Sequence, residues 1–257
     1  MSVEMATIGN VGGHDLLPGF CAAVSEDLAL LASLHAAELS KALVSNLHEK
    51  KFPLSLALVF EEKEMRSVVT MLYEEISRWP RDFPAAIAEE LAADYAAIYL
   101  NNYCNASPQE SFWLDDDHLA WQEPMFQVRE IYANHDLEVT NWRIQADDHI
   151  VPELQFIAYL LGRSDAAEQL DDVAQFLDEH LLLWLGDFSR RVARRCDTPF
   201  YAGLALLTNN YCETLRDLLA AILDKPRLDR DAVLQRRKRE KAEPVPVKFI
   251  PGAEASW

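Results

Sequence analysis

Apolar residues recur along most of the chain at the three- and four-residue spacing of an amphipathic helix, and this pattern limits the fold most. From Phe20 onward they stand at Val24, Leu28, Leu31, Leu34, Leu39, Leu43 and Leu47. No stretch shows the sustained alternation of apolar and polar residues that a half-buried strand requires. Glycine and proline, 8 and 12 in 257 residues, gather where connections are expected. The sequence therefore predicts an all-α protein.

Breaks in this pattern divide the chain into separate predicted helices. Pro80 ends one of them, and Pro84 stands in the first turn of the next, where its missing N–H costs no hydrogen bond. Gly162 is a predicted C-cap. We expect helices at about 20–47, 61–79, 83–101, 119–134, 150–161, 165–195 (broken near Leu183–Trp184), 198–223 and 229–241.

The segment 136–147 has no clear period and separates two groups of predicted helices. No repeat of 20–50 residues is visible, and a chain of this length can bury a substantial core. We predict a loosely ordered leader at 1–19, an N-terminal helical lobe at 20–135, a hinge at 136–147, a C-terminal helical lobe at 148–224, and a basic helix with an extended tail at 225–257.

The formal charge of −18 argues against a bare nucleic-acid-binding protein, because such proteins normally carry a basic face. The charge favours partners that present arginine or lysine. It is also uneven, since eight basic residues stand with three acidic ones between Lys225 and Lys241. Such a run is typical of a solvated helix packed near an acidic face, and RNA or membrane binding is the minority interpretation.

The cysteines and apolar runs indicate the compartment. The four cysteines are scattered, with no CxxC pair. No apolar run reaches the roughly 20 residues that a membrane-spanning helix needs. The N-terminus lacks the basic start and apolar core of a secretory signal. We therefore expect a cytoplasmic protein with reduced thiols and no integral membrane segment.

The stretch ADDHIVPELQFIAYLLG, from residue 146 to 162, places two carboxylates and an imidazole before an apolar helix. Asp147 or Asp148 is a natural N-cap, because a carboxylate accepts backbone N–H groups of the first turn. His149 and Glu153 stand four residues apart on one helix face, and a surface pair is the simplest interpretation. An HxxxE pattern without further ligands indicates metal only weakly, so no metal site is predicted.

Signatures of catalysis and of nucleotide binding are missing from the sequence. It contains no GxxxxGK[ST] or GxGxxG loop and no GxSxG nucleophile elbow. No cysteine stands in a recognisable catalytic context. We therefore expect no enzymatic activity and no cofactor.

A second unusual stretch, SPQESFWLDDDH (107–118), sets Phe112 and Trp113 beside three aspartates. Side chains this large usually fold into the core. The alternative is a half-buried aromatic rim beside acid, which suits a peptide with apolar and arginine residues. Tyr95 and Tyr99 on the preceding predicted helix raise the same choice, with core packing favoured.

Three segments in combination, DYAAIY (94–99), SPQESFW (107–113) and ADDHIVPELQFIAYL (146–160), resemble the TorD/DmsD family of redox-enzyme maturation chaperones, to which NarJ-type proteins are related. FLDEHLLLWLGDF (176–188) adds the family's His-Leu…Trp element in the expected position. Order and approximate spacing agree from about residue 40 to 222. The resemblance therefore covers most of the chain.

This resemblance implies a cytoplasmic, all-α, TorD-like bundle of two lobes joined by a hinge, as a monomer or a domain-swapped dimer. It implies binding of the twin-arginine leader and the body of a molybdenum-cofactor oxidoreductase subunit, which is kept unexported until its cofactor is inserted. Some family members bind guanine nucleotide, and the sequence does not decide this point. The runner-up function is a helical adaptor or scaffold that binds another folded partner.

The resemblance also points to a mixed site, because the leader carries two guanidiniums followed by an apolar stretch. Carboxylates suit bidentate pairing with guanidinium, and an apolar groove suits the remainder. Asp147 departs from the family, which usually has proline there, and Pro152 lies inside the motif. We expect the polar part of the site at Asp147, Asp148, His149 and Glu153. We expect aromatic walls at Tyr95, Tyr99, Phe112, Trp113 and Trp142.

Overall fold

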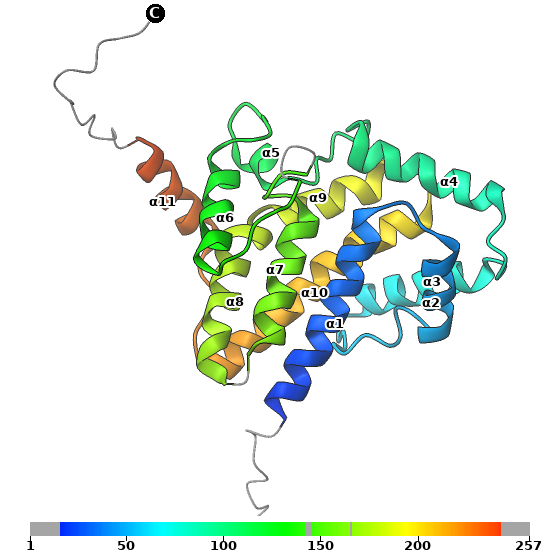
Figure 1. Cartoon of the computed structure of the whole chain (residues 1–257), viewed down its shortest axis with the longest axis horizontal. Helices are drawn as coiled ribbons and strands as arrows, with labels where there is room; N and C mark the ends of the chain where they lie inside the picture. Colours follow the sequence, from blue (N-terminus) through cyan, green and yellow to red (C-terminus); the bar gives the residue numbers. More distant parts are fainter. Residues whose placement is uncertain (1–15, 142–144, 165, 243–257) are drawn as a thin grey trace, which may run out of the picture. The chain divides into compact units, whose positions relative to one another are not determined.

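The computed structural model describes residues 16–141, 145–164 and 166–242, and within them the regular elements are helices (Figure 1). The prediction of an all-α protein is confirmed, whereas the division into two lobes with a hinge at 136–147 stays a prediction. The α-helices are α1 Leu17–Ala36, α2 Lys41–Lys50, α3 Lys63–Arg78, α4 Ala85–Tyr95, α5 Glu110–Leu114, α6 Glu123–Asn134, α7 Ile150–Gly162, α8 Leu170–Phe176, α9 Leu182–Arg195, α10 Pro199–Leu223 and α11 Arg230–Ala242.

The chain forms two compact units by its internal contacts. The first extends to Arg227 and contains α1 to α10. The second begins at Leu228 and contains α11, whose first turn is supported by a bond from the Ala232 N–H to Asp229 Oδ1 at 2.8 Å. The candidate site described below lies in the first unit.

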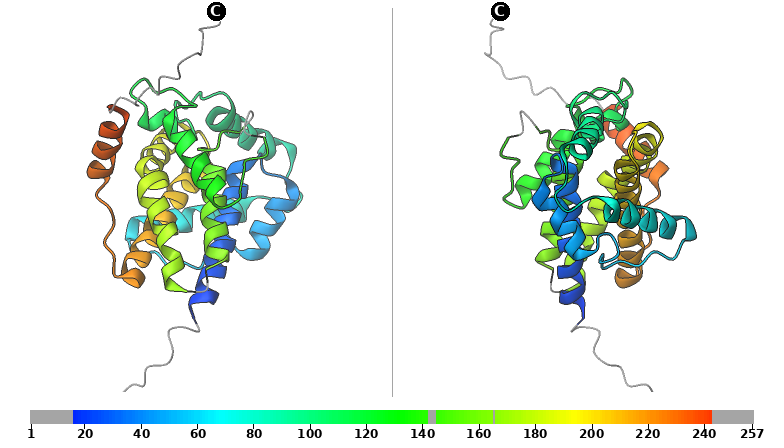
Figure 2. Two further views of the ribbon diagram at one scale, coloured as in Figure 1. Left: turned by 60° about the vertical axis from the view of Figure 1, so that its left-hand side comes forward. Right: turned by 90° about the vertical axis from the view of Figure 1, so that its right-hand side faces the viewer.

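Three helix pairs form the core of the first unit. Helix α1 lies along α7, and α10 packs against both α9 and α3 (Figure 1, Figure 2). α1 is long and apolar enough to cross a membrane by length and composition, although the sequence predicted no run of this length. Its residues Val24, Leu28 and Leu31 are completely buried in the core. The buried apolar face of α1 is thus explained by its packing in the core.

The predicted helix at 20–47 is two helices in the structure. α1 ends at Ala36, and α2 begins at Lys41 after an extended connection. Ser40 produces the second start, because its hydroxyl oxygen accepts the Leu43 N–H at 3.2 Å, as an N-cap does. Apolar spacing alone could not show this break, since the periodicity continues across it.

Two π-helical turns interrupt longer helices. One, Ala96–Leu100, continues α4, and the other, Leu177–Leu181, separates α8 from α9. The break expected near Leu183–Trp184 therefore lies a few residues earlier. Such turns are frequent at functional sites, and these two carry Tyr99 and His180. Both residues belong to motifs that the sequence singled out.

Candidate functional site

An antiparallel bridge between Gln109 and His149 joins the loop before α5 to the start of α7. The Glu110 N–H donates to the Asp148 carbonyl oxygen at 2.9 Å, and the Ile150 N–H donates to the Pro108 carbonyl oxygen at 2.8 Å. Two sequence motifs that are far apart along the chain therefore meet at one place.

Asp148 is completely buried and caps α5, the helix of the other motif. Its Oδ2 accepts the backbone N–H of Ser111 at 2.8 Å and also the Ser111 hydroxyl. The α7 cap predicted for Asp147 or Asp148 is instead His149, whose Nδ1 accepts the Val151 N–H at 3.1 Å. Burial raises the pKa of Asp148 to about 6, although its bonds with Ser111 oppose that shift.

Asp147 is buried and already holds a guanidinium. Its Oδ2 accepts Nε–H and Nη2–H of Arg129 on α6 at 3.1 and 2.7 Å. The Arg129 side chain is 37% exposed and lies over the ring of Phe126, 5.6 Å from its centroid. The Tyr132 hydroxyl donates to the Asp147 backbone carbonyl oxygen at 3.2 Å. Asp147 is therefore a guanidinium-binding carboxylate whose occupant reaches the surface.

Glu153 faces inward, so the surface pair predicted with His149 is wrong. Glu153 is completely buried, and its Oε2 accepts the Trp184 Nε1–H at 3.3 Å. Burial raises the pKa of Glu153 well above its ordinary value, and the nearby carboxylates Glu110 and Asp148 raise it further. The side chain therefore favours its neutral form inside an acidic cluster.

The same cluster contains residues that the site prediction missed. Glu110 is completely buried and pairs with His180, whose Nδ1 lies 3.0 Å from Glu110 Oε2. His180 stacks on Phe176 with ring centroids 5.1 Å apart. Glu110, His180 and Trp184 all stand inside the motifs that carried the family resemblance, so the signal for them was present. A spacing pattern cannot show that three separate motifs point toward one interior point.

Tyr95 and Tyr99 lie together with His149. The ring centroids of Tyr95 and Tyr99 are 4.8 Å apart, and those of Tyr99 and His149 are 6.5 Å apart. The Tyr95 hydroxyl donates to the Ala36 carbonyl oxygen at 2.9 Å, which ties it to the end of α1. Tyr95 is buried, whereas Tyr99 and His149 are half-buried. Burial lowers the pKa of His149 to about 4, so this imidazole is neutral at physiological pH.

Phe112 and Trp113 form a second aromatic group on α5. Both are half-buried, and their rings pack edge-to-face with centroids 5.4 Å apart. Trp113 Nε1–H donates to the Ser107 carbonyl oxygen at 2.8 Å, and the Arg191 guanidinium lies 4.5 Å from the ring centroid. The last predicted aromatic wall, Trp142, lies outside the described residues.

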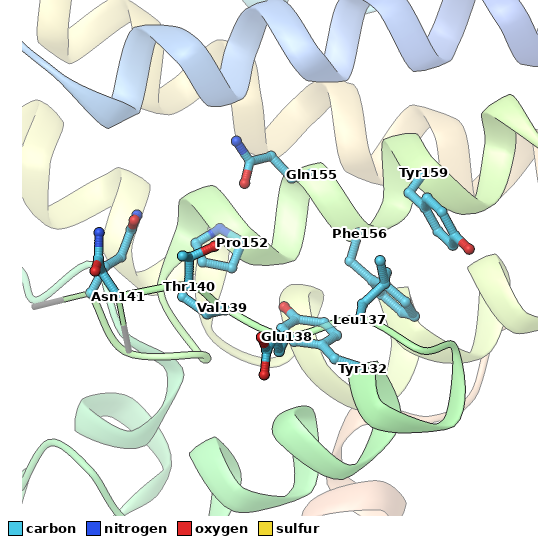
Figure 3. Close-up of a pocket in the computed structure, with 11 residues that line it drawn as sticks. Tyr132, Leu137, Glu138, Val139, Thr140, Asn141, Pro152, Gln155, Phe156 and Tyr159 are labelled. Atoms are coloured by element: carbon cyan, nitrogen blue, oxygen red, sulfur yellow. The ribbon is translucent and has the colours of Figure 1, made fainter. Parts of the chain in front are cut away.

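A hollow of about 350 Å³ lies between the end of α6, the segment 137–141 and the outer face of α7 (Figure 3). Tyr132 connects it to Asp147, because its ring lines the hollow while its hydroxyl bonds to the Asp147 backbone. The lining is apolar and uncharged polar apart from one carboxylate, Glu138. It consists of Tyr132, Leu137, Glu138, Val139, Thr140, Asn141, Gln145, Pro152, Gln155, Phe156 and Tyr159.

The carboxylates around the bridge already have partners. Within residues 16–141, 145–164 and 166–242, no three histidine, cysteine or acidic side chains are grouped so that they could hold a metal ion. The carboxylates closest to the bridge are occupied by Arg129, Ser111, Trp184 and His180. The site thus combines a carboxylate that is paired with a guanidinium, Asp147 with Arg129, and a mostly apolar hollow beside the same helix, α7.

Comparison with known proteins agrees with the motifs. The sequence model of a family described as nitrate reductase delta subunit matches residues 62–190. That match spans both motifs of the bridge, the π turn at Leu177–Leu181 and most of α9.

Individual relatives extend the similarity over more of the chain. The chaperone protein TorD of Shewanella pealeana is 29% identical over 203 residues, which is 76% of this chain and 89% of the relative. The TorD chaperone of Vibrio atlanticus is 26% identical over 198 residues, covering 74% and 91% of the two chains. That of Vibrio cholerae is 28% identical over 185 residues, covering 69% and 83%.

Proposed function

The chain belongs to the nitrate reductase delta subunit family of TorD- and NarJ-related maturation chaperones, and we propose that it binds the twin-arginine signal peptide of a redox-enzyme subunit. The client is a molybdenum-cofactor oxidoreductase subunit, bound through its leader and its body. The chaperone holds this subunit in the cytoplasm until the cofactor is inserted, and it does so as a monomer or a domain-swapped dimer, without catalysis.

The pairing of Asp147 with Arg129 is the observation that supports this proposal most. A buried carboxylate at the motif position where the family usually has proline accepts two N–H groups of one guanidinium, and that guanidinium is partly exposed. A leader arginine can replace Arg129 on Asp147 without moving the carboxylate, because both arginines pair with it through the same guanidinium group.

The hollow of Figure 3 supports the second half of the recognition. A twin-arginine leader continues into apolar sequence, and Tyr132 lines the hollow together with Pro152 and Phe156 while its hydroxyl bonds to the backbone of Asp147. The negative charge of the chain attracts the leader from a distance, so the affinity falls as salt is added.

The remaining predicted residues receive different proposed roles. Asp148 and Glu153 point inward, and they tie the start of α7 to Ser111 and to Trp184, so they position the site without touching the peptide. His149 and Tyr99 are half-buried beside the bridge and remain candidates for direct contact, as do Phe112 and Trp113.

The test is calorimetry of the full chain with a synthetic leader peptide that carries two adjacent arginines before an apolar stretch. Asp147→Asn removes the negative charge at nearly constant shape and should weaken binding by about tenfold or more. Arg129→Gln removes the internal competitor and should tighten binding. Asp187→Asn, which breaks an exposed pair with Arg190 on α9, is the matched control and should change nothing. Unchanged affinity of a folded Asp147→Asn protein would exclude Asp147 from the site.

A further inference from the structure

A second groove, of about 570 Å³, lies on the first unit between the start of α1, the segment 57–62, the start of α3 and the middle of α10. It shares no lining residue with the hollow of Figure 3. Its apolar lining includes Phe20, Leu58, Met65 and Leu218. Val59 at its edge is 81% exposed, which is unusual for a large aliphatic side chain.

The segment that forms one wall of the groove is tied to the core. Asp27 on α1 accepts the Ala57 N–H at 2.6 Å and the Tyr211 hydroxyl at 2.7 Å through the same oxygen. The rings of Phe60 and Tyr211 pack edge-to-face with centroids 6.5 Å apart. These contacts anchor the segment 57–62 to α1 and α10, so the apolar wall of the groove has a fixed position in the first unit.

The opposite edge of the groove is acidic and already accepts an arginine. Glu213 and Asp217 both line the groove and stand one turn apart on α10. Arg227, just after α10, donates Nη1–H to Asp217 Oδ1 at 3.1 Å and Nη2–H to Glu213 Oε2. The two carboxylates are thus spaced to receive both arms of a single guanidinium.

We propose that this groove docks a segment of a protein partner in which an arginine is followed by apolar side chains, and that this arginine takes the place of Arg227. Two further acids, Glu61 and Glu62, line the groove, so the surface attracts a basic segment and repels phosphate. Displacing Arg227 costs little, because its ion pairs are partly solvated and exposed pairs contribute little to stability. The site is independent of the proposed signal-peptide function.

The probe is a short fluorescent peptide with one arginine followed by leucine, leucine and phenylalanine. Its affinity is measured by anisotropy for the full chain carrying Asp147→Asn, so that the first site does not contribute. Arg227→Ala removes the internal competitor and should tighten binding by up to about fivefold. The double variant Glu213→Gln/Asp217→Asn should weaken binding by a similar factor, and so should a peptide with citrulline in place of arginine. Asp187→Asn, on α9, is the matched control and should leave the affinity unchanged.

If Arg227→Ala disturbs the segment after α10, a second variant still tests the proposal. Val59→Asp puts a charge on an exposed position of the apolar wall, so the fold should tolerate it while the peptide binds less well. The proposal is overturned if Arg227→Ala binds the probe no more tightly than the chain that retains Arg227, or if the citrulline peptide binds equally well. Loss of leader binding in Asp147→Asn would not bear on it, because the two sites share no residue.

Discussion

The carboxylate of Asp148 caps α5, a helix that lies earlier in the sequence: its Oδ2 accepts the backbone N–H of Ser111, 37 residues before it, at 2.8 Å. α5 has only five residues, and helices this short are not stable without tertiary support. The Asp148–Ser111 contact and the adjacent backbone bridge supply that support. They fix the aromatic pair on α5 relative to the start of α7.

Replacing Asp148 by alanine should therefore destabilise the fold. The substitution leaves the N–H and the hydroxyl of Ser111 buried without their acceptor, and the expected loss in the free energy of unfolding is about 2 kcal/mol. Ser111→Ala keeps the bond from the Ser111 N–H but removes the hydroxyl, which also accepts the Gln122 N–H at 3.2 Å, so this variant does not isolate the cap. Urea denaturation of Asp148→Ala measures the loss, and a loss below about 0.5 kcal/mol would contradict the capping role.

Glu153 should make the protein less stable as the pH rises. Its raised pKa means that the folded chain keeps a proton that the unfolded chain has released above about pH 4.5, so the stabilising contribution is present below that pH and is lost at higher pH. Glu153→Gln keeps an acceptor for Trp184 without any titration. The stability of the variant relative to the natural chain should rise as the pH increases from 5. If the difference in urea midpoint between Glu153→Gln and the natural chain does not change with pH, Glu153 is not neutral in the fold.

The sequence predicted the helices well because burial of one apolar face gives a periodic signal. It failed where a local contact interrupts a continuing period, as Ser40 does between α1 and α2. It also could not place the π turn at Leu177–Leu181, since its two leucines stand four residues apart and continue the helical spacing.

The candidate site shows the same limit more strongly. The motifs around Asp147 and Ser111 were visible, but the partners of their side chains depend on tertiary contacts. Nothing in the spacing shows that Arg129 on α6 reaches Asp147, or that Glu153 points to Trp184 and away from solvent. Residue types identified the motifs, whereas the direction of each side chain required the fold.

His35 should remain neutral far below its ordinary pKa. It is completely buried, and burial lowers its pKa to about 3. Thr208 donates its hydroxyl proton to the Leu204 carbonyl oxygen, so it accepts Nε2–H of His35 at 2.9 Å. Nδ1 then accepts the Tyr99 hydroxyl at 2.5 Å, and a second ring proton would break that bond.

The stabilising contribution of neutral His35 is present above about pH 6.5 and is lost as the pH falls. At pH 5 the loss is about 2 kcal/mol, because the unfolded chain binds a proton there and the folded chain does not. The NMR shifts of the His35 ring nitrogens should stay constant from pH 7 to pH 5. His35→Gln should lose less stability over this interval than the natural chain, and titration of the ring near pH 6 would contradict the assignment.

Two helical glycines should respond to alanine in opposite directions. A Cβ on Gly203 of α10 would lie 2.6 Å from Leu72 Cγ of α3, and Leu72 is completely buried. Gly203→Ala should therefore destabilise the protein by about 1–3 kcal/mol. Gly186 of α9 has only the ends of flexible side chains at 3.4 Å or more, so Gly186→Ala should stabilise it by up to about 1 kcal/mol. Thermal unfolding of the pair tests whether close contact between α3 and α10 requires glycine.

The buried ion pair between Arg216 and Asp178 should be costly to break from one side only. Nε and Nη2 of Arg216 donate to the two oxygens of Asp178 at 2.8 and 2.7 Å, and both side chains are 3% exposed. Arg216→Ala leaves a buried carboxylate without its cation and should cost about 3–5 kcal/mol. The double variant Arg216→Met/Asp178→Leu removes both charges and should recover most of that loss, because the desolvation cost of the pair disappears as well.

The same arginine also ties the segment after α10 to that helix, since Nη2 donates to the Pro226 carbonyl oxygen at 3.2 Å. The double variant Arg216→Met/Asp178→Leu loses this bond. It should keep the stability predicted above, while the adjacent Arg227 separates more readily from Glu213 and Asp217. Binding of the arginine peptide to the second groove should then tighten in the double variant. Urea midpoints and peptide affinity together separate the two effects of Arg216, and unchanged affinity would show that Pro226 does not position Arg227.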